Sequence, residues 1–231
     1  MTTVYPDIVN PVVAPTGVYP PQEDSQLLID VLQNSGLAPG RRVVDLGAGS
    51  GVLAIAAATM GARDVTAFDS CPNAVACAKG NARTAGVHVE VRLGSWTLAK
   101  AAGPFDVVVA NPPYVPAGPH AEAEVIPSSA GPTYAWNAGP DGRLILDPLC
   151  DSAAELLTDG GTLLLVQSCF ADVAQSLQRL RSSGLSASVV ARQLIPFGPV
   201  LTARAQWLED TCRLPVGRRE EELVVIRADK P

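Results

Sequence analysis

Several kinds of residue are scarce in this sequence, and each shortage counts against a class of function. Aromatic residues make up only 5% of the chain and charged residues only 17%. The formal net charge is −6, and no run of Lys or Arg is longer than the pairs Arg41-Arg42 and Arg218-Arg219. Binding along duplex nucleic acid needs several cationic contacts to phosphates, and binding to single strands needs a row of stacking rings. The sequence therefore argues against an extended nucleic-acid surface.

The patterns of disulfide frameworks, zinc sites and membrane segments are also missing. The five cysteines are odd in number, scattered, and never spaced as Cys-x-x-Cys, so we expect free thiols in a reducing compartment and no metal site. The longest apolar stretch, VLAIAAATM, is far too short to span a bilayer, and the N-terminus has neither a basic start nor an apolar core. We expect a cytoplasmic protein without a membrane segment.

What the sequence does have is an alternation of apolar runs and helical patterns. Apolar residues make up 47% of 231 residues, enough for one domain with a single core. Strand-like runs include RVVDLG, DVTAFD, VHVEVRL, FDVVVA and GTLLLVQS, and helical patterns fall at 25–36, 52–61, 72–86, near 142–157 and at 171–184. This alternation predicts an α/β fold with a doubly wound, mostly parallel, seven-stranded sheet of Rossmann-like type. The last strand is expected to be antiparallel.

The chain divides into an arm and one domain. Residues 1–24 are rich in proline and predict an N-terminal arm that covers the ligand cleft, whereas residues 25–231 predict a single domain. The last two strand-like runs, at 186–195 and 221–229, are separated by an insertion at about 196–220. Proline and glycine surround a short helical pattern, ARAQWLED, within that insertion.

A glycine-rich turn follows the first predicted strand. The sequence VVDLGAGSG places Gly47, Gly49 and Gly51 on alternate positions, with Asp45 two residues ahead of them. Glycines at the carboxyl end of a strand let backbone N–H groups approach a ligand. The spacing differs from the G-x-G-x-x-G dinucleotide fingerprint, and a carboxylate just before the turn suits a ligand with a positive end. Alone, the motif is also compatible with a turn that only packs a strand on a helix.

Asp69 ends the second predicted strand, twenty residues after Gly49. A carboxylate at this place can accept hydrogen bonds from both hydroxyls of a ribose. The alternative is that Asp69 or Ser70 only caps the helix that begins near Pro72. Combined with the glycine turn, the pattern favours a nucleoside site.

The fourth predicted strand ends in Asn111-Pro112-Pro113-Tyr114, at the same edge of the sheet as the glycine turn. Each proline holds the residue before it in extended geometry, which fixes the directions of the Asn111 and Pro112 carbonyls. Two fixed carbonyls can accept both protons of an NH₂ group, and Tyr114 can pack against a planar acceptor. We call residues 111–114 the acceptor corner. It is a candidate binding site for an NH₂ group, and the alternative is a rigid turn without a ligand.

These motifs resemble those of a known family. DLGAGSG, Asp69 and NPPY at these spacings look like a class I S-adenosylmethionine-dependent methyltransferase that modifies amino groups. The segment GVYPPQEDSQLL and the later WNAGPDGR resemble the compact branch of the HemK-type protein glutamine N5-methyltransferases, which modify translation release factors. The resemblance runs from about residue 17 to about residue 184.

The resemblance implies roles for particular residues. Ser25, Asp45, Gly47, Gly49 and Asp69 would line the site of S-adenosylmethionine, and Asn111, Pro112 and Tyr114 would hold the methyl acceptor. The family usually has an acidic residue facing the adenine after the third strand. Here the sequence is Gly94-Ser95-Trp96, so we expect Ser95 to accept the hydrogen bond of the adenine amino group and Trp96 to pack nearby.

We therefore expect an S-adenosylmethionine-dependent N-methyltransferase whose acceptor is the glutamine of a release-factor-like loop. The resemblance also implies a small activating subunit, as in eukaryotic relatives. Two alternatives stay open: a nucleobase or small-molecule amine N-methyltransferase, and a non-catalytic nucleoside-binding scaffold. Glu122 and Glu124, in the loop after the acceptor corner, are interpreted as solvated charges rather than substrate contacts.

Overall fold

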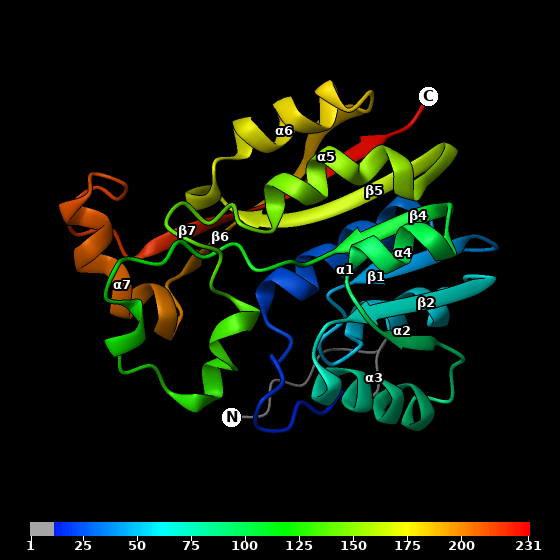
Figure 1. The fold of residues 1–231 in the computed structure, drawn as a ribbon, viewed down its shortest axis with the longest axis horizontal. Helices are drawn as coiled ribbons and strands as arrows, with labels where there is room; N and C mark the ends of the chain where they lie inside the picture. The colour runs from blue at the N-terminus through cyan, green and yellow to red at the C-terminus, as the bar shows by residue number, and fades with distance from the viewer. Residues whose placement is uncertain (1–11) are drawn as a thin grey trace.

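The structure is a computed structural model that describes residues 12–231. Residues 1–11, which include the first part of the predicted arm, lie outside the described residues. The strands are β1 (Arg42–Leu46), β2 (Asp64–Asp69), β3 (Glu90–Leu93), β4 (Phe105–Ala110), β5 (Leu157–Ser168), β6 (Ser186–Pro196) and β7 (Glu220–Asp229). They form one seven-stranded sheet in the order β3-β2-β1-β4-β5-β7-β6 (Figure 1).

Strands β1 to β5 pair in parallel, while β7 lies between β5 and β6 and is antiparallel to both. The predicted fold, including its antiparallel last strand, is confirmed. The parallel strands are apolar runs because helices cover both of their faces. Val43 and Val44, for example, point to opposite faces of the sheet and are both buried.

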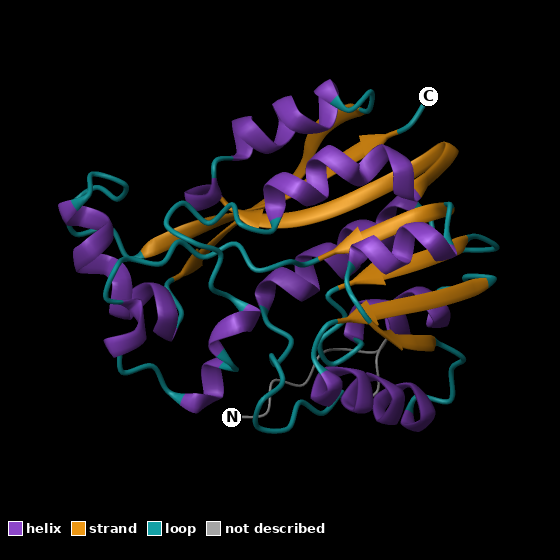
Figure 2. Cartoon of the chain, in the orientation of Figure 1, coloured by secondary structure: helices purple, strands orange, loops and turns teal. Residues whose placement is uncertain are grey.

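The helices are α1 (Glu23–Ser35), α2 (Val52–Thr59), α3 (Pro72–Thr84), α4 (Trp96–Ala102), α5 (Leu146–Leu156), α6 (Val173–Ser182) and α7 (Pro199–Asp210). Helices α1, α2 and α3 lie on one face of the sheet and α4, α5 and α6 on the other (Figure 2). Helix α2 is apolar up to its last residue, Thr59, and its residues 52–57 are all buried, as expected for a helix enclosed by its neighbours. Within residues 12–231, no helix is long and apolar enough to cross a membrane.

Helix α1 begins two residues before the predicted start and packs against β5, β6 and α2. Its apolar residues Leu28, Ile29 and Leu32 are buried, and it ends at Gly36, whose φ of 62° is left-handed. The helix therefore lies on the sheet. The extended residues just before it reach the cavity described below.

The 29 residues at 115–143 connect β4 to the region of α5 without a long helix. Short 3₁₀ turns occur at Ala121–Ala123, Ser128–Ala130 and Thr133–Ala135. Figure 1 shows this green connection and the orange helix α7 on the same side, beyond the carboxyl edge of the parallel strands. We call residues 115–143 the acceptor loop, because they follow the acceptor corner directly.

Candidate active site

A cavity of ≈ 490 Å³ lies at the carboxyl edge of the sheet. Its walls come from the ends of β1, β2 and β4, from the residues after β3, from the extended segment before α1 and from the acceptor loop. Of the residues predicted from the sequence, those that line the cavity are Ser25, Gly47, Gly49, Asp69, Ser95, Trp96, Asn111 and Pro112. The carboxyl edge of a doubly wound sheet is where ligands bind in such folds.

Asp69 is oriented by the backbone around it. Its Oδ2 accepts a hydrogen bond from the N–H of Gly49 at 2.8 Å, and its Oδ1 accepts one from the N–H of Cys71 at 2.8 Å. Each carboxylate oxygen can accept a further bond, so Asp69 retains capacity for ligand hydroxyls. Asp69 does not act as the cap of α3, because that helix has Cys71 at its N-cap and makes no side-chain capping bond.

Asp45 and Gly51 lie behind the cavity rather than in its lining. Asp45 is fully buried, and its Oδ2 accepts a hydrogen bond from the N–H of Ala54 at 3.1 Å, whereas its Oδ1 has no partner among the described residues. Burial raises the pKa of Asp45 to about 7. Gly51 allows α2 and α3 to approach closely, since a Cβ there would lie 2.9 Å from the Cβ of Ala78.

The acceptor corner is bound to the start of α1. The Nδ2 of Asn111 lies 3.4 Å from the hydroxyl of Ser25, and the hydroxyl of Tyr114 donates to Oδ2 of Asp24 at 3.0 Å. The carbonyl oxygen of Asn111 faces the glycine turn, because a Cβ on Gly47 would lie 3.8 Å from it. Tyr114 is buried and does not line the cavity, so its ring supports the corner from behind.

Asp24 is the centre of a buried polar cluster that sequence reasoning missed. Its Oδ2 also accepts a bond from the hydroxyl of Tyr19 at 3.2 Å, and its Oδ1 accepts one from the N–H of Ser25 at 2.6 Å. Burial raises the pKa of both Tyr19 and Tyr114 well above the usual range, and the charge of Asp24 adds to the rise. The two phenols therefore remain protonated and act as donors to Asp24.

Glu221, at the start of β7, belongs to the same cluster. It is 7% exposed, and its Oε2 has no hydrogen-bond partner among the described residues. Burial raises the pKa of Glu221 to about 7, with a further rise from the charge of Asp24. The only local signal for Glu221 in the sequence is a run of three glutamates, which does not distinguish a buried residue from an exposed one.

Ser95 and Trp96 lie at the start of α4, where both line the cavity. The Ser95 and Thr97 hydroxyls are 2.7 Å apart and share a hydrogen bond. The predicted contact of Ser95 with an adenine remains a prediction. Tyr134, which sequence reasoning missed, also lines the cavity, and its hydroxyl lies 3.0 Å from the carbonyl oxygen of Gly17 and 2.9 Å from Sγ of Cys71. The acceptor loop thus meets the segment before α1 across the cavity.

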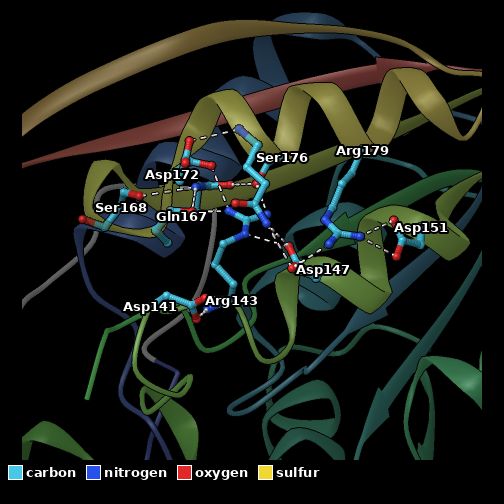
Figure 3. Close-up of polar contacts among 11 residues, drawn as sticks. Asp141, Arg143, Asp147, Asp151, Gln167, Ser168, Asp172, Ser176 and Arg179 are labelled. Carbon is cyan, nitrogen blue, oxygen red and sulfur yellow. Dashed lines mark hydrogen bonds and ion pairs between the residues drawn. The ribbon is translucent and has the colours of Figure 1, made fainter. Parts of the chain in front are cut away.

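The WNAGPDGR segment packs directly on the acceptor corner. A Cβ on Gly142 would lie 2.4 Å from the carbonyl oxygen of Tyr114, and its φ is 78°, so only glycine fits there. The next residue, Arg143, is 3% exposed. Its side chain donates to Asp147 at 2.6 Å, to Ser176 at 3.1 Å and to the carbonyl of Ala171 (Figure 3). The end of the acceptor loop is therefore fixed to α5 and α6.

The interpretation of Glu124 as a solvated charge is wrong. Its side chain is 17% exposed and forms an ion pair with Arg204 of α7 at 2.9 Å. Glu122 is exposed, in agreement with its interpretation. Nothing in the local sequence indicates the pair, because its two members are 80 residues apart.

The fold and the site together define a class I methyltransferase. The sheet has an antiparallel last strand, and one cavity lies beside both the glycine turn after β1 and the Asn-Pro-Pro-Tyr corner. Residues 12–127 match the methyltransferase small domain family. A protein of Methanocaldococcus jannaschii, provisionally named a protein N5-glutamine methyltransferase, is 33% identical over 188 residues, which are 81% of this chain and 91% of that protein. The chain therefore belongs to the HemK-type methyltransferases of the small-domain family, and it is an enzyme.

Two further proteins are similar to this chain, one in sequence and one in fold. The release factor glutamine methyltransferase of Deinococcus radiodurans is 41% identical over 125 residues, and the match covers 54% of this chain but only 44% of that protein. The Mtq2 and Trm112 complex of E. cuniculi has been solved, and this chain matches it with a TM-score of 0.62 at 21% identity, over 93% of this chain and 99% of that chain. At that identity the match supports the fold alone.

Proposed function

We propose that this protein transfers a methyl group from S-adenosylmethionine to the side-chain amide nitrogen of a glutamine in a protein. The observation that carries the proposal is the acceptor corner, where Asn111 and Pro112 line the cavity next to Gly47, Gly49 and Asp69. The M. jannaschii and D. radiodurans relatives are both named for glutamine methylation. The net charge of −6 also disfavours a long polyanionic substrate.

The residues of the cavity suit S-adenosylmethionine. The carboxylate of Asp69, held by two backbone N–H groups, is available to ribose hydroxyls. Asp45, whose Oδ1 has no hydrogen-bond partner among the described residues, lies behind the glycine turn, and a cationic ligand in the cavity would favour its ionised form. Ser95 and Trp96 form the wall where an adenine would lie. The bound cofactor supplies an electrophilic methyl group on a sulfonium.

The acceptor corner prepares the nucleophile. An amide nitrogen is a poor nucleophile because its lone pair is delocalised into the carbonyl group. The carbonyls of Asn111 and Pro112 are restrained by the prolines that follow them, and they can accept both protons of the NH₂ group. Holding both protons turns the nitrogen lone pair toward the methyl group, and proximity then contributes most of the rate. Water takes the proton of the alkylated nitrogen, which is strongly acidic.

The target that fits best is the Gly-Gly-Gln loop of a translation release factor. Glycines beside the glutamine allow the backbone to enter a narrow cleft without side-chain collisions. Tyr19 of the segment before α1 and Tyr134 of the acceptor loop both line the cavity. A reaction on release factors takes place where translation occurs, so the proposal also places the protein in the cytoplasm.

The test is a methyl-transfer assay with labelled S-adenosylmethionine. The acceptors are a release factor, its Gln→Ala variant in the Gly-Gly-Gln loop, an RNA and a single-stranded DNA oligonucleotide. Label is expected on the native release factor and not on the alanine variant. Label on nucleic acid or on a free amine would support a nucleobase or amine methyltransferase. Cofactor binding without transfer to any acceptor would support a nucleoside-binding scaffold.

We also propose that a small activating subunit assists this enzyme. The E. cuniculi structure is a complex of Mtq2 with Trm112. Among the described residues β3 is an edge strand of the sheet, and Leu93 at its end and Leu98 of α4 are 55% and 54% exposed. Apolar side chains next to an unpaired strand edge favour association. If the purified chain reaches full turnover alone, and co-expressed small proteins do not raise it, this part of the proposal is wrong.

A further inference from the structure

Helix α7 packs on the acceptor loop. Trp207 of α7 lies against Gly118 of the loop so closely that a Cβ on this glycine would lie 2.9 Å from the indole ring. Leu201, Ala205 and Leu208 form the buried face of α7. The helix therefore has a specific packing partner beyond the edge of the sheet (Figure 1).

Arg204 is the centre of this contact and has no exposed surface. Its guanidinium donates to the carbonyl of Pro116 at 2.6 Å, to Oδ1 of Asn137 at 2.5 Å and to the carboxylate of Glu124 at 2.9 Å. It also lies over the ring of Trp136, 4.8 Å from its centroid. One side chain thus binds three separate parts of the acceptor loop.

The parts held by Arg204 include both sides of a short two-stranded ribbon. The N–H of Val115 donates to the carbonyl of Trp136 at 2.9 Å, and the N–H of Ala138 donates to the carbonyl of Val115 at 3.1 Å. The first side of this ribbon begins immediately after Tyr114. The second side follows Tyr134 and Ala135, which line the cavity. Pro116 lies on the first side and Asn137 on the second.

Burying a guanidinium is costly, and the energy recovered from its ion pair alone seldom exceeds that of an apolar replacement. A planar group with five donors is, however, suited to joining several acceptors in a fixed geometry. Arg204 makes this use of its donors, because two of them bind acceptors on opposite sides of the ribbon. Its position indicates that Arg204 fixes the two sides of the ribbon relative to each other, in addition to neutralising the charge of Glu124.

We propose that Arg204 is a positioning residue for methyl transfer. By holding the ribbon, it fixes the acceptor corner relative to the part of the loop that lines the cofactor cavity. The insertion at 196–220 is then a part of the acceptor side of the active site. The catalytic consequence of this inference rests on the proposed function. The contacts of Arg204 with the ribbon, in contrast, are a property of the chain alone.

The experiment uses three variants at Arg204 and one control variant, all in the full chain. Arg204→Met removes the donors and leaves the half-buried Glu124 without its ion-pair partner. The double variant Arg204→Met with Glu124→Gln removes the unpaired charge, so it should recover most of the melting temperature lost in the single variant. Arg204→Lys keeps a positive charge without the planar fork. Arg181→Met, on α6 and remote from the loop, is the matched control.

In the glutamine assay, kcat is expected to fall about 100-fold in all three Arg204 variants, the scale of a misplacement of about 1 Å. S-Adenosylmethionine affinity should be nearly unchanged, because Asp69 is the last residue of β2 and the glycine turn follows β1, both apart from the ribbon. Arg181→Met should behave like the native enzyme. Native kcat in the double variant or in Arg204→Lys would show that Arg204 only neutralises Glu124, and would overturn the inference.

Amide hydrogen exchange tests whether Arg204 holds the ribbon, and it needs no methyl acceptor. Arg204→Met should lose protection at the amides of Val115 and Ala138, while amides of β1 and β4 keep theirs. Unchanged protection at Val115 and Ala138 overturns the inference even if turnover falls. If the native enzyme methylates no glutamine, the proposed function fails, and the exchange result still decides whether Arg204 holds the ribbon.

Discussion

The hydroxyl of Tyr114 donates a hydrogen bond to the carboxylate of Asp24 across 3.0 Å, although the two residues are 90 positions apart in the chain. This bond joins the last residue of the acceptor corner to the first turn of α1. The neighbouring residues Asn111 and Ser25 approach each other in the same way. The acceptor corner is therefore held from two sides, by the start of α1 and by the acceptor loop.

Tyr114→Phe removes the hydroxyl and leaves the ring in place. We expect the free energy of unfolding to fall by about 1.5–3 kcal/mol, the scale of a hydrogen bond to a charged group, and turnover to fall because the corner loses its tie to α1. Urea denaturation and the glutamine assay measure the two effects. Tyr19→Phe is the control, since it removes a bond to the same oxygen from outside the corner. Equal turnover losses in both variants would contradict a specific role for Tyr114.

Asp69→Ala should weaken binding of S-adenosylmethionine by roughly 1.5–3 kcal/mol, the scale of a hydrogen bond to a charged group. Asp69 also accepts bonds from Gly49 and Cys71, so Asp69→Asn is needed as a variant that keeps one oxygen acceptor. We expect Asp69→Asn to bind with intermediate affinity in calorimetry, and NAD not to bind to any form. Native affinity in both variants would remove Asp69 from the site.

Asn111→Ala keeps the backbone carbonyl of the corner but removes the side-chain amide that joins the corner to Ser25. We expect the rate of methyl transfer to fall by on the order of 10²–10³, as for the loss of one preorganised polar contact. Cofactor affinity should change little, because Asp69 and the glycine turn, which line the cavity, stay intact. Single-turnover kinetics and calorimetry separate the two quantities. Asn34→Ala, at an exposed position of α1, serves as the control. Normal transfer by Asn111→Ala would reduce the corner to a structural turn.

Glu221→Gln should change how stability depends on pH. Burial raises the pKa of Glu221 from 4.5 to about 7, so between these values the native state holds a proton that the unfolded state has released. The contribution of protonated Glu221 to the free energy of unfolding is fully present below pH 4.5 and is lost as pH rises through 7. The charges and dipoles facing it are Asp24 and Glu23 of α1, Ser168 of β5 and the phenols of Tyr19 and Tyr114.

Glutamine does not titrate, so the variant should lose less stability than the native protein as pH rises from 5 to 8. At pH 8 it should be the more stable of the two, by at most about 3 kcal/mol. Urea denaturation at pH 5, 6, 7 and 8 measures the difference. Parallel pH profiles for the two proteins would mean that Glu221 is ionised throughout.

The sequence allowed the sheet and the floor of the cavity to be predicted because both depend on local patterns. Apolar runs identified the strands, and motifs at the ends of parallel strands necessarily meet at one edge, which brought Gly47, Asp69 and Asn111 together. Residues such as Asp24, Glu221 and Arg204 were missed because their roles depend on contacts between distant segments. The short helix α4 and the early start of α1 were missed because only a few residues decide them. The division at residue 24 remains a prediction.

Tyr134 of the acceptor loop reaches the carbonyl of Gly17 across the cavity, so a single loop both follows the acceptor corner and closes part of the cofactor cavity. A protein bound at the corner would hold this loop in place and keep that wall closed. The demethylated cofactor is therefore expected to leave after the methylated protein, as the second product of an ordered reaction. In product-inhibition kinetics, the demethylated cofactor should compete with S-adenosylmethionine, and the methylated protein should compete with neither substrate.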